Sequence, residues 1–97
     1  MGSSQVHLTR DLHHIRAHHL HYASLLQDMR KSIRFIQTTP NPAMDSVDIP
    51  PQVKLDSAKL LEKECNYLLS EIERLDMQLH LQDSRLKNVM NLVSGWL

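Results

Sequence analysis

The sequence predicts an all-α protein in which two long amphipathic helices form an antiparallel helical hairpin or coiled coil. Two stretches of the chain carry apolar residues at alternating steps of four and three, which is the spacing of a heptad repeat. All four prolines lie between these stretches, and the only glycines stand near the chain ends, at positions 2 and 95. Since proline and glycine most disfavour a helix interior, each stretch can form one uninterrupted helix.

The first helix is predicted over residues 6–37, after a flexible N-terminus at 1–5. Heptad position a is occupied by Leu12, His19, Leu26 and Ile33, and position d by Leu8, Ile15, Tyr22, Met29 and Ile36. We call the line of a and d side chains that packs against another helix the seam. His19 is the only polar residue in this part of the predicted seam.

A linker is predicted over residues 38–56. It holds all four prolines, which lack an amide donor and crowd the preceding turn. At this length it is long for a connection between helices. Asp56 or Ser57 is predicted to cap the next helix, because a short side-chain oxygen accepts hydrogen bonds from the free amides of a first turn.

The second helix is predicted over residues 57–94, followed by a tail at 95–97. Position a reads Ala58, Cys65, Ile72, Leu79, Leu86 and Val93, and position d reads Leu61, Leu68, Leu75, Gln82, Val89 and Trp96. The side chains expected at the helix interface are Leu12, Ile15, His19, Tyr22, Leu26, Leu61, Leu68, Ile72, Leu75, Leu79, Leu86 and Val89. Two helices alone bury little apolar area against the entropy of ordering the chain. We therefore expect further helices, from a second copy or from a larger parent protein.

Composition argues against several classes of function. The eleven basic and eleven acidic residues balance, so no net field draws the chain to nucleic acid, and no nucleic-acid partner is expected. No apolar run approaches the ~20 residues that span a bilayer, and no signal peptide is recognisable, so a membrane is expected only through a larger parent protein. With two glycines, the chain offers no phosphate-cradling loop and no turn that presents a nucleophile. We expect that it is not an enzyme.

Cys65 is the only cysteine, which favours a reducing compartment because no disulfide can form within the chain. At position a it is interpreted as a small buried apolar residue. In a parallel homodimer it would instead face its own copy and could oxidise across the interface.

Six of the seven histidines lie in the first helix, and this density invites a functional interpretation. His14, His18 and His21 are spaced so that their imidazoles lie near one helix face and could hold Zn²⁺ or Ni²⁺, although no carboxylate or thiol on that face completes the ligand set. A second hypothesis is pH sensing, in which a charged His19 disfavours packing of the seam. The interpretation we favour is that His19 sets the register of the helices and that the other histidines are exposed.

Other sites are weaker. The basic segment at 30–34 could touch phosphates or anionic lipid, but a solvated or acid-pairing face is favoured. Trp96 could be the last d residue or could sit at a membrane interface. Asp45 and Asp48 could bind Mg²⁺, although isolated loop carboxylates are usually solvated. No cofactor is expected.

Three short stretches carry a family resemblance: IRAHHLHYASLL, TTPNPAM and RLKNVMNLV. Together with their surroundings, 12–44 and 59–93, they resemble the cytoplasmic helices that precede the membrane segment in fungal CorA-like magnesium transporter proteins. In that family five copies surround an ion pore, and the first transmembrane helix ends in a Gly-Met-Asn motif. This sequence contains neither that motif nor the membrane helices. The resemblance therefore implies a fragment or truncated relative.

These observations predict a non-enzymatic structural or interaction module, cytoplasmic and possessing no pore, that packs on a helical partner or on itself. The resemblance implies a place at the membrane surface, within or upon a transporter-like assembly. The alternatives are a stand-alone coiled-coil scaffold, or a metal-responsive or pH-responsive binding module that acts through the histidine-rich helix.

Overall fold

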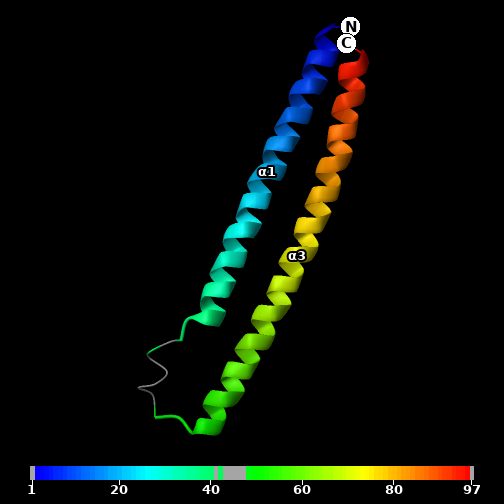
Figure 1. Ribbon diagram of the computed structural model, residues 1–97. Helices are drawn as coiled ribbons and strands as arrows, with labels where there is room; N and C mark the ends of the chain where they lie inside the picture. Colours follow the sequence, from blue (N-terminus) through cyan, green and yellow to red (C-terminus); the bar gives the residue numbers. More distant parts are fainter. Residues whose placement is uncertain (1, 41, 43–47, 97) are drawn as a thin grey trace.

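The computed structural model describes residues 2–40, 42 and 48–96. Helix α1 spans Gly2–Thr38 and helix α3 spans Pro51–Trp96. The two helices pack antiparallel, so that the start of α1 and the end of α3 lie together at one end of the molecule (Figure 1). The predicted all-α hairpin is thereby confirmed.

Both helices are longer than predicted. Helix α1 begins at Gly2, so most of the segment expected to be a flexible N-terminus is helical, and α3 continues through Gly95 to Trp96. These additions change the ends of the elements but leave the heptad pattern of each helix unbroken.

The start of α3 differs from the prediction for a clear reason. Pro51 is the first helical residue, a position where proline's missing amide costs nothing and its fixed φ already suits the helix. The carbonyl of Pro50 accepts hydrogen bonds from the amides of Val53 at 3.0 Å and Lys54 at 3.2 Å. Asp56 therefore lies inside the helix and not at its cap, where its carboxylate accepts a 3.0 Å hydrogen bond from the Gln52 side chain.

Helix α1 ends where the sequence approaches Pro40. The residue before a proline is sterically driven out of the helical region, and Thr39 is the last residue to donate its amide to the helix, to the carbonyl of Phe35 at 2.9 Å. The hydroxyl of Thr38 donates to the carbonyl of Arg34 at 2.7 Å. The first of these bonds gives the Phe35 carbonyl a partner that it would otherwise lack at the helix end.

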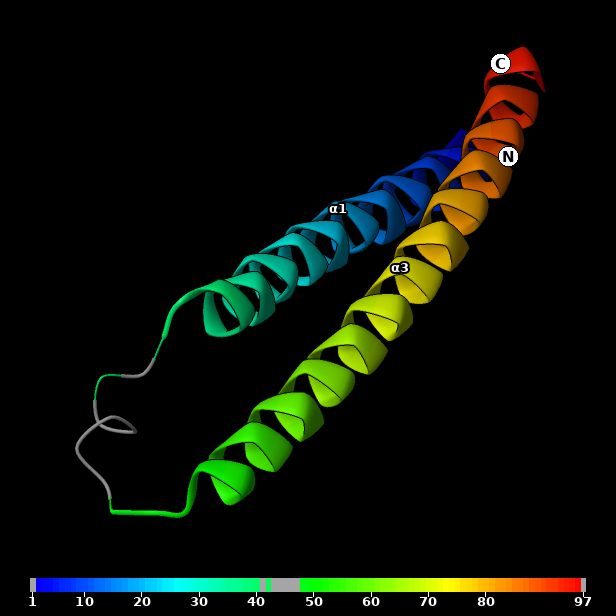
Figure 2. The same cartoon turned by 60° about the horizontal axis from the view of Figure 1, so that its bottom comes forward.

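The molecule is a long, thin rod of 73 × 18 × 15 Å with a radius of gyration of 21.9 Å. A compact domain of this length would have a radius near ~12 Å. Because α3 is nine residues longer than α1, with 46 residues against 37, its first turns extend past the end of α1 (Figures 1 and 2). Among the described helices, neither combines the length and apolarity needed to cross a membrane.

The core between the helices is thin. The buried apolar side chains of the described residues are Leu12, Ile33, Cys65, Ile72, Leu86 and Val93. The accessible surface of 7845 Å² is well above the ~5,700 Å² expected for a compact monomer of this mass. Much apolar surface therefore remains in contact with solvent.

Candidate interaction surface

The seam between α1 and α3 uses the predicted a positions together with the e positions, which stand four residues after each a. Every a residue of α1 is buried or half-buried, and so is every a residue of α3 from Cys65 onward. The e residues, all half-buried, are Thr9, Arg16, Ala23, Arg30, Gln37, Leu69, Asp76, Asp83 and Met90. The apolar heptad pattern did not predict these e residues as part of the interface.

Two apolar clusters hold the hairpin together, one toward each end. Near the chain termini the buried residues are Leu12, Leu86 and Val93, with Met90 packed against them. Near the connection the buried residues are Ile33, Cys65 and Ile72, with Leu26 and Leu69 packed against them. Cys65 thus faces α1 of its own chain, which supports the interpretation of a small buried apolar residue.

Polar pairs cross the seam between and beyond these clusters. His19 Nδ1 lies 3.8 Å from Asp83 Oδ1, and a nitrogen of Arg30 lies 3.9 Å from a carboxylate oxygen of Asp76. At the end of α1, the Gln37 amide donates to Asn66 Oδ1 at 2.8 Å. The charged partners from α1 are basic and those from α3 are acidic. The pairs therefore favour contact between α1 and α3 over contact between two α1 helices.

His19 therefore does not stand alone in the seam. Asp83 also lies 3.3 Å from the amine of Lys87, and neither His19 Nδ1 nor Asp83 Oδ1 makes a hydrogen bond within the described residues. Arg16, one turn before His19, also has a buried Nε that makes no hydrogen bond within the described residues. His19 thus has a carboxylate beside it in the seam. The pH-sensing hypothesis stays a prediction.

The d residues lie outside this seam. Ile15, Tyr22, Leu68, Leu75 and Val89, all predicted at the helix interface, are exposed in the hairpin. Leu61 is exposed as well, in the part of α3 that precedes its first buried seam residue, Cys65. These six residues are therefore not buried by the other helix of the hairpin, and their predicted place at a helix interface stays a prediction. Leu12, His19, Leu26, Ile72, Leu79 and Leu86 do lie in the seam, as predicted.

The d residues of both helices point to one side of the hairpin. In an antiparallel pair that shares the a and e positions, the d positions of both helices fall on the same face. Met29 of α1 and Leu68 and Leu75 of α3 accordingly line one shallow groove between the helices, with a volume of about 560 Å³. We call this side the d face. Its members are Leu8, Ile15, Tyr22, Met29, Ile36, Leu61, Leu68, Leu75, Gln82 and Val89.

The two long sides of the hairpin differ in polarity. Nine of the ten residues of the d face are apolar or aromatic, and Gln82 is the exception. The opposite side is formed by the b positions, the residue after each a: Val6, His13, Leu20, Gln27, Arg34, Asn66, Glu73, His80, Lys87 and Ser94. Eight of these ten residues are polar, and we call this side the b face. An apolar side of this length, bordered by a polar one, is typical of a surface that binds protein.

Glu71 and Arg74 form an ion pair at the edge of the groove. Arg74 donates two hydrogen bonds to Glu71 Oε2, at 2.7 and 3.3 Å. These bonds and the attraction of the carboxylate raise the pKa of Arg74. Glu71 itself lines the groove beside Leu75. Its charge is paired with that of Arg74 on the same helix.

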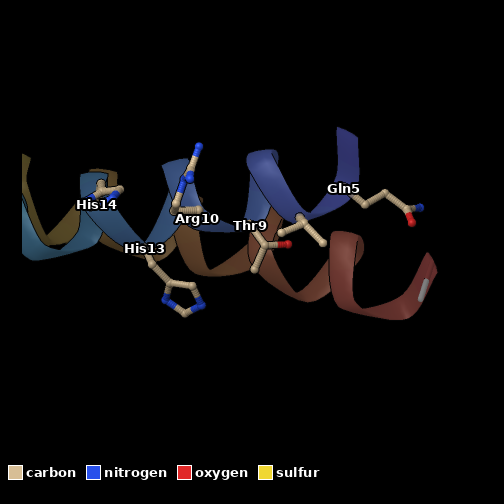
Figure 3. Close-up of a pocket in the computed structure, with 6 residues that line it drawn as sticks. Gln5, Thr9, Arg10, His13 and His14 are labelled. Atoms are coloured by element: carbon tan, nitrogen blue, oxygen red, sulfur yellow. The ribbon is translucent and has the colours of Figure 1, made fainter. Parts of the chain in front are cut away.

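The support for a binding site is weaker in the histidine-rich part of α1 than on the d face. His14, His18 and His21 are all exposed, and no group of three His, Cys, Asp or Glu placed to hold a metal ion is found in the described part of the chain. A second shallow groove of about 510 Å³ lies near the start of α1, lined by residues that include His13 and His14. Figure 3 shows that His13 and Arg10 point in different directions from the helix. The zinc hypothesis for these residues stays a prediction.

The basic segment, the loop carboxylates and Trp96 are the remaining candidates from the sequence. In the basic segment, Arg30 pairs across the seam and Ile33 is buried, which agrees with an acid-pairing face at this point. Asp48 is exposed before α3, whereas Asp45 lies outside the described residues. The backbone of Trp96 belongs to α3, but its side chain is not among those described.

Comparisons with known proteins identify no relative. No protein family, no curated protein and no solved structure matches this chain. The resemblance to CorA-like proteins thus remains an interpretation of the three short sequence stretches.

Proposed function

We propose that this chain is a non-enzymatic structural module whose function is to dock on other helices through the d face. The observation that carries this proposal is the arrangement of the heptads. Both helices keep an apolar d position over most of their length, yet the d residues of the d face are exposed in the hairpin, whose seam is formed by the a and e positions. An apolar residue repeated at heptad spacing is expected to pack against a helix, so the d face lacks its helical partner within a single hairpin.

The shape of the surface fits helices better than other ligands. The groove of the d face is shallow and continuous with the space between α1 and α3, and it is lined by Leu, Ile and Met side chains with few charges at its margin. Small-molecule sites are usually deep and enclosed, with converging polar groups. A row of half-exposed Leu, Ile and Met side chains instead accepts the ridges of another helix.

Photo-cross-linking tests this function. A photoreactive benzoylphenylalanine replaces Met29 on the d face, and in a control chain it replaces Leu20 on the b face of the same helix. Both positions are exposed, at 52% and 61%. In cells that make the whole chain, we expect covalent adducts from position 29 and few from position 20. Equal yields from the two positions, or none from either, would contradict docking through the d face.

A finer candidate is that the helical partner belongs to a CorA-like magnesium transporter assembly at the membrane surface. Support for it comes from the three sequence stretches and from the elongated helical form expected of a stalk-proximal region. Its test is the identity of the other proteins that are cross-linked to the chain in cells. A partner that spans the membrane and sediments with it supports this candidate. Partners that all lack membrane helices reject it.

A further inference from the structure

We propose that the occupant of the d face is a second copy of this chain, and that the two hairpins form a four-helix bundle. The two-fold axis runs along the hairpin, so that α1 of each copy covers α3 of the other and both connections lie at the same end. This inference rests on the proposed function, because it names the partner of the same surface.

The hairpin has the geometry of half a four-helix bundle. In such bundles the a and d side chains of all four helices point to a common core, and neighbouring helices pack about 20° from antiparallel. Here the a residues border the contact between α1 and α3, and the d residues face the open side. Two further helices with the same heptad spacing would complete this core.

A second copy of the chain meets this requirement. It supplies two antiparallel helices of matching length whose d residues repeat at the same intervals. Nine half-exposed apolar side chains at roughly 80 Å² each give ~700 Å² per copy, close to the ~800 Å² per partner of a standard interface. Since the chain carries no net charge, two copies do not repel each other at long range.

The polar residue of the d face finds a partner in the orientation in which α1 covers α3. The cross-seam pairs His19 with Asp83 and Arg30 with Asp76 fix the register, which places Tyr22 of α1 level with Gln82 of α3. When α1 covers α3 of the second copy, the hydroxyl of Tyr22 comes level with the amide of Gln82 in that copy. A buried amide needs such a partner, so this layer would set the register between copies.

Sedimentation equilibrium of the whole chain tests the occupant. We expect a reversible dimer in the wild type and at least a tenfold weaker dimer in Met29→Glu, because each interface would then bury two unpaired carboxylates. Leu20→Glu on the b face is the matched control and should dimerise as the wild type does. Circular dichroism of each variant checks that the hairpin is retained, and Leu75→Glu with Leu81→Glu as its control repeats the comparison on α3.

Two results overturn the proposal and separate it from the proposed function. A monomer at high concentration whose position 29 cross-links another helical protein rejects the second copy and leaves docking through the d face intact. A dimer that both Met29→Glu and Leu20→Glu leave unchanged rejects the d face as the contact between copies.

Spin labels then test the orientation. A label at Lys59→Cys, near the connection, in a Cys65→Ala chain gives one label per copy. The proposed dimer places the two labels at the same end, with a short distance between them in pulsed electron resonance. A separation approaching the 73 Å length of the rod means that the connections lie at opposite ends, and overturns the proposed orientation.

Discussion

His19 of α1 and Asp83 of α3 face each other across the seam, with Nδ1 and Oδ1 3.8 Å apart and both atoms buried. Asp83 also lies 3.3 Å from the amine of Lys87, and Arg16 stands one turn before His19 on α1. Together these residues form a polar layer between the two apolar clusters. This layer ties the register of the hairpin to charge.

We expect Asp83→Asn to destabilise the hairpin, because the variant removes the carboxylate that lies 3.8 Å from His19 and 3.3 Å from Lys87. The loss of unfolding free energy should be on the order of 1 kcal/mol, reduced by the partial exposure of these groups. Urea unfolding followed by circular dichroism measures it, with Glu73→Gln on the b face as the control. An equal loss in the two variants would mean that Asp83 does not stabilise the seam.

Reversing the charges of the Arg30 and Asp76 pair should show how the register is specified. Arg30→Asp alone places two acidic groups together and should cost about 1 kcal/mol of unfolding free energy. Adding Asp76→Arg restores an attractive pair and should recover most of that loss. The double-mutant cycle gives the coupling energy between the two sites, and a coupling of zero would contradict their contact across the seam.

Truncations in the seam and on the d face should differ in their dependence on protein concentration. Ile72 is 3% exposed inside the hairpin, so Ile72→Ala should cost about 2–4 kcal/mol at any concentration. Leu75 lies on the d face, so the cost of Leu75→Ala should grow as the wild type dimerises. Thermal unfolding over a wide concentration range separates the two. A concentration-independent cost for Leu75→Ala speaks against a dimer contact there.

The rate at which a reagent modifies the Cys65 thiol shows whether the seam is closed in solution. It is 4% exposed and packed near Ile33 and Ile72, so a thiol reagent should modify it many times more slowly in buffer than in urea. The labelling rate is measured by absorbance, with a Lys59→Cys chain in the Cys65→Ala background as the exposed reference. Equal rates for the two thiols would show that α1 does not cover Cys65.

Zinc binding by the histidines should be weak. His14, His18 and His21 are exposed on one helix, and stable zinc sites usually have four ligands held in place by the fold. Calorimetric titration at neutral pH should give no more than a low affinity that the triple alanine variant changes little. A tight site lost in that variant would revive the metal-responsive function.

The sequence was sufficient for the two helices, for the hairpin as their simplest arrangement and for half of the seam. Leu12, Ile72 and Leu86 at position a are buried as predicted, because a strong heptad repeat leaves little choice about which stripe meets another helix. The start of α3 was harder to predict, since Pro51 can either end a linker or begin a helix.

The second half of the seam could not be found from apolar periodicity. The e residues include Arg16, Arg30, Asp76 and Asp83, and charged residues at heptad flanks are usually solvated. The signal that existed was electrostatic: in an antiparallel register, basic e residues of the first helix come level with acidic e residues of the second. Apolar periodicity instead predicted the d positions, which are exposed in the hairpin.

Methionine oxidation footprinting tests the central claim most directly, because it compares two residues of the same chemistry in one chain. Met29 lies on the d face and is 52% exposed, and Met77 lies on the outer surface of α3 and is 74% exposed. In dilute protein both should oxidise readily. As the concentration rises, we expect Met29 to become protected while Met77 stays reactive. Unchanged oxidation of Met29 at every concentration would contradict a d face covered by a second copy.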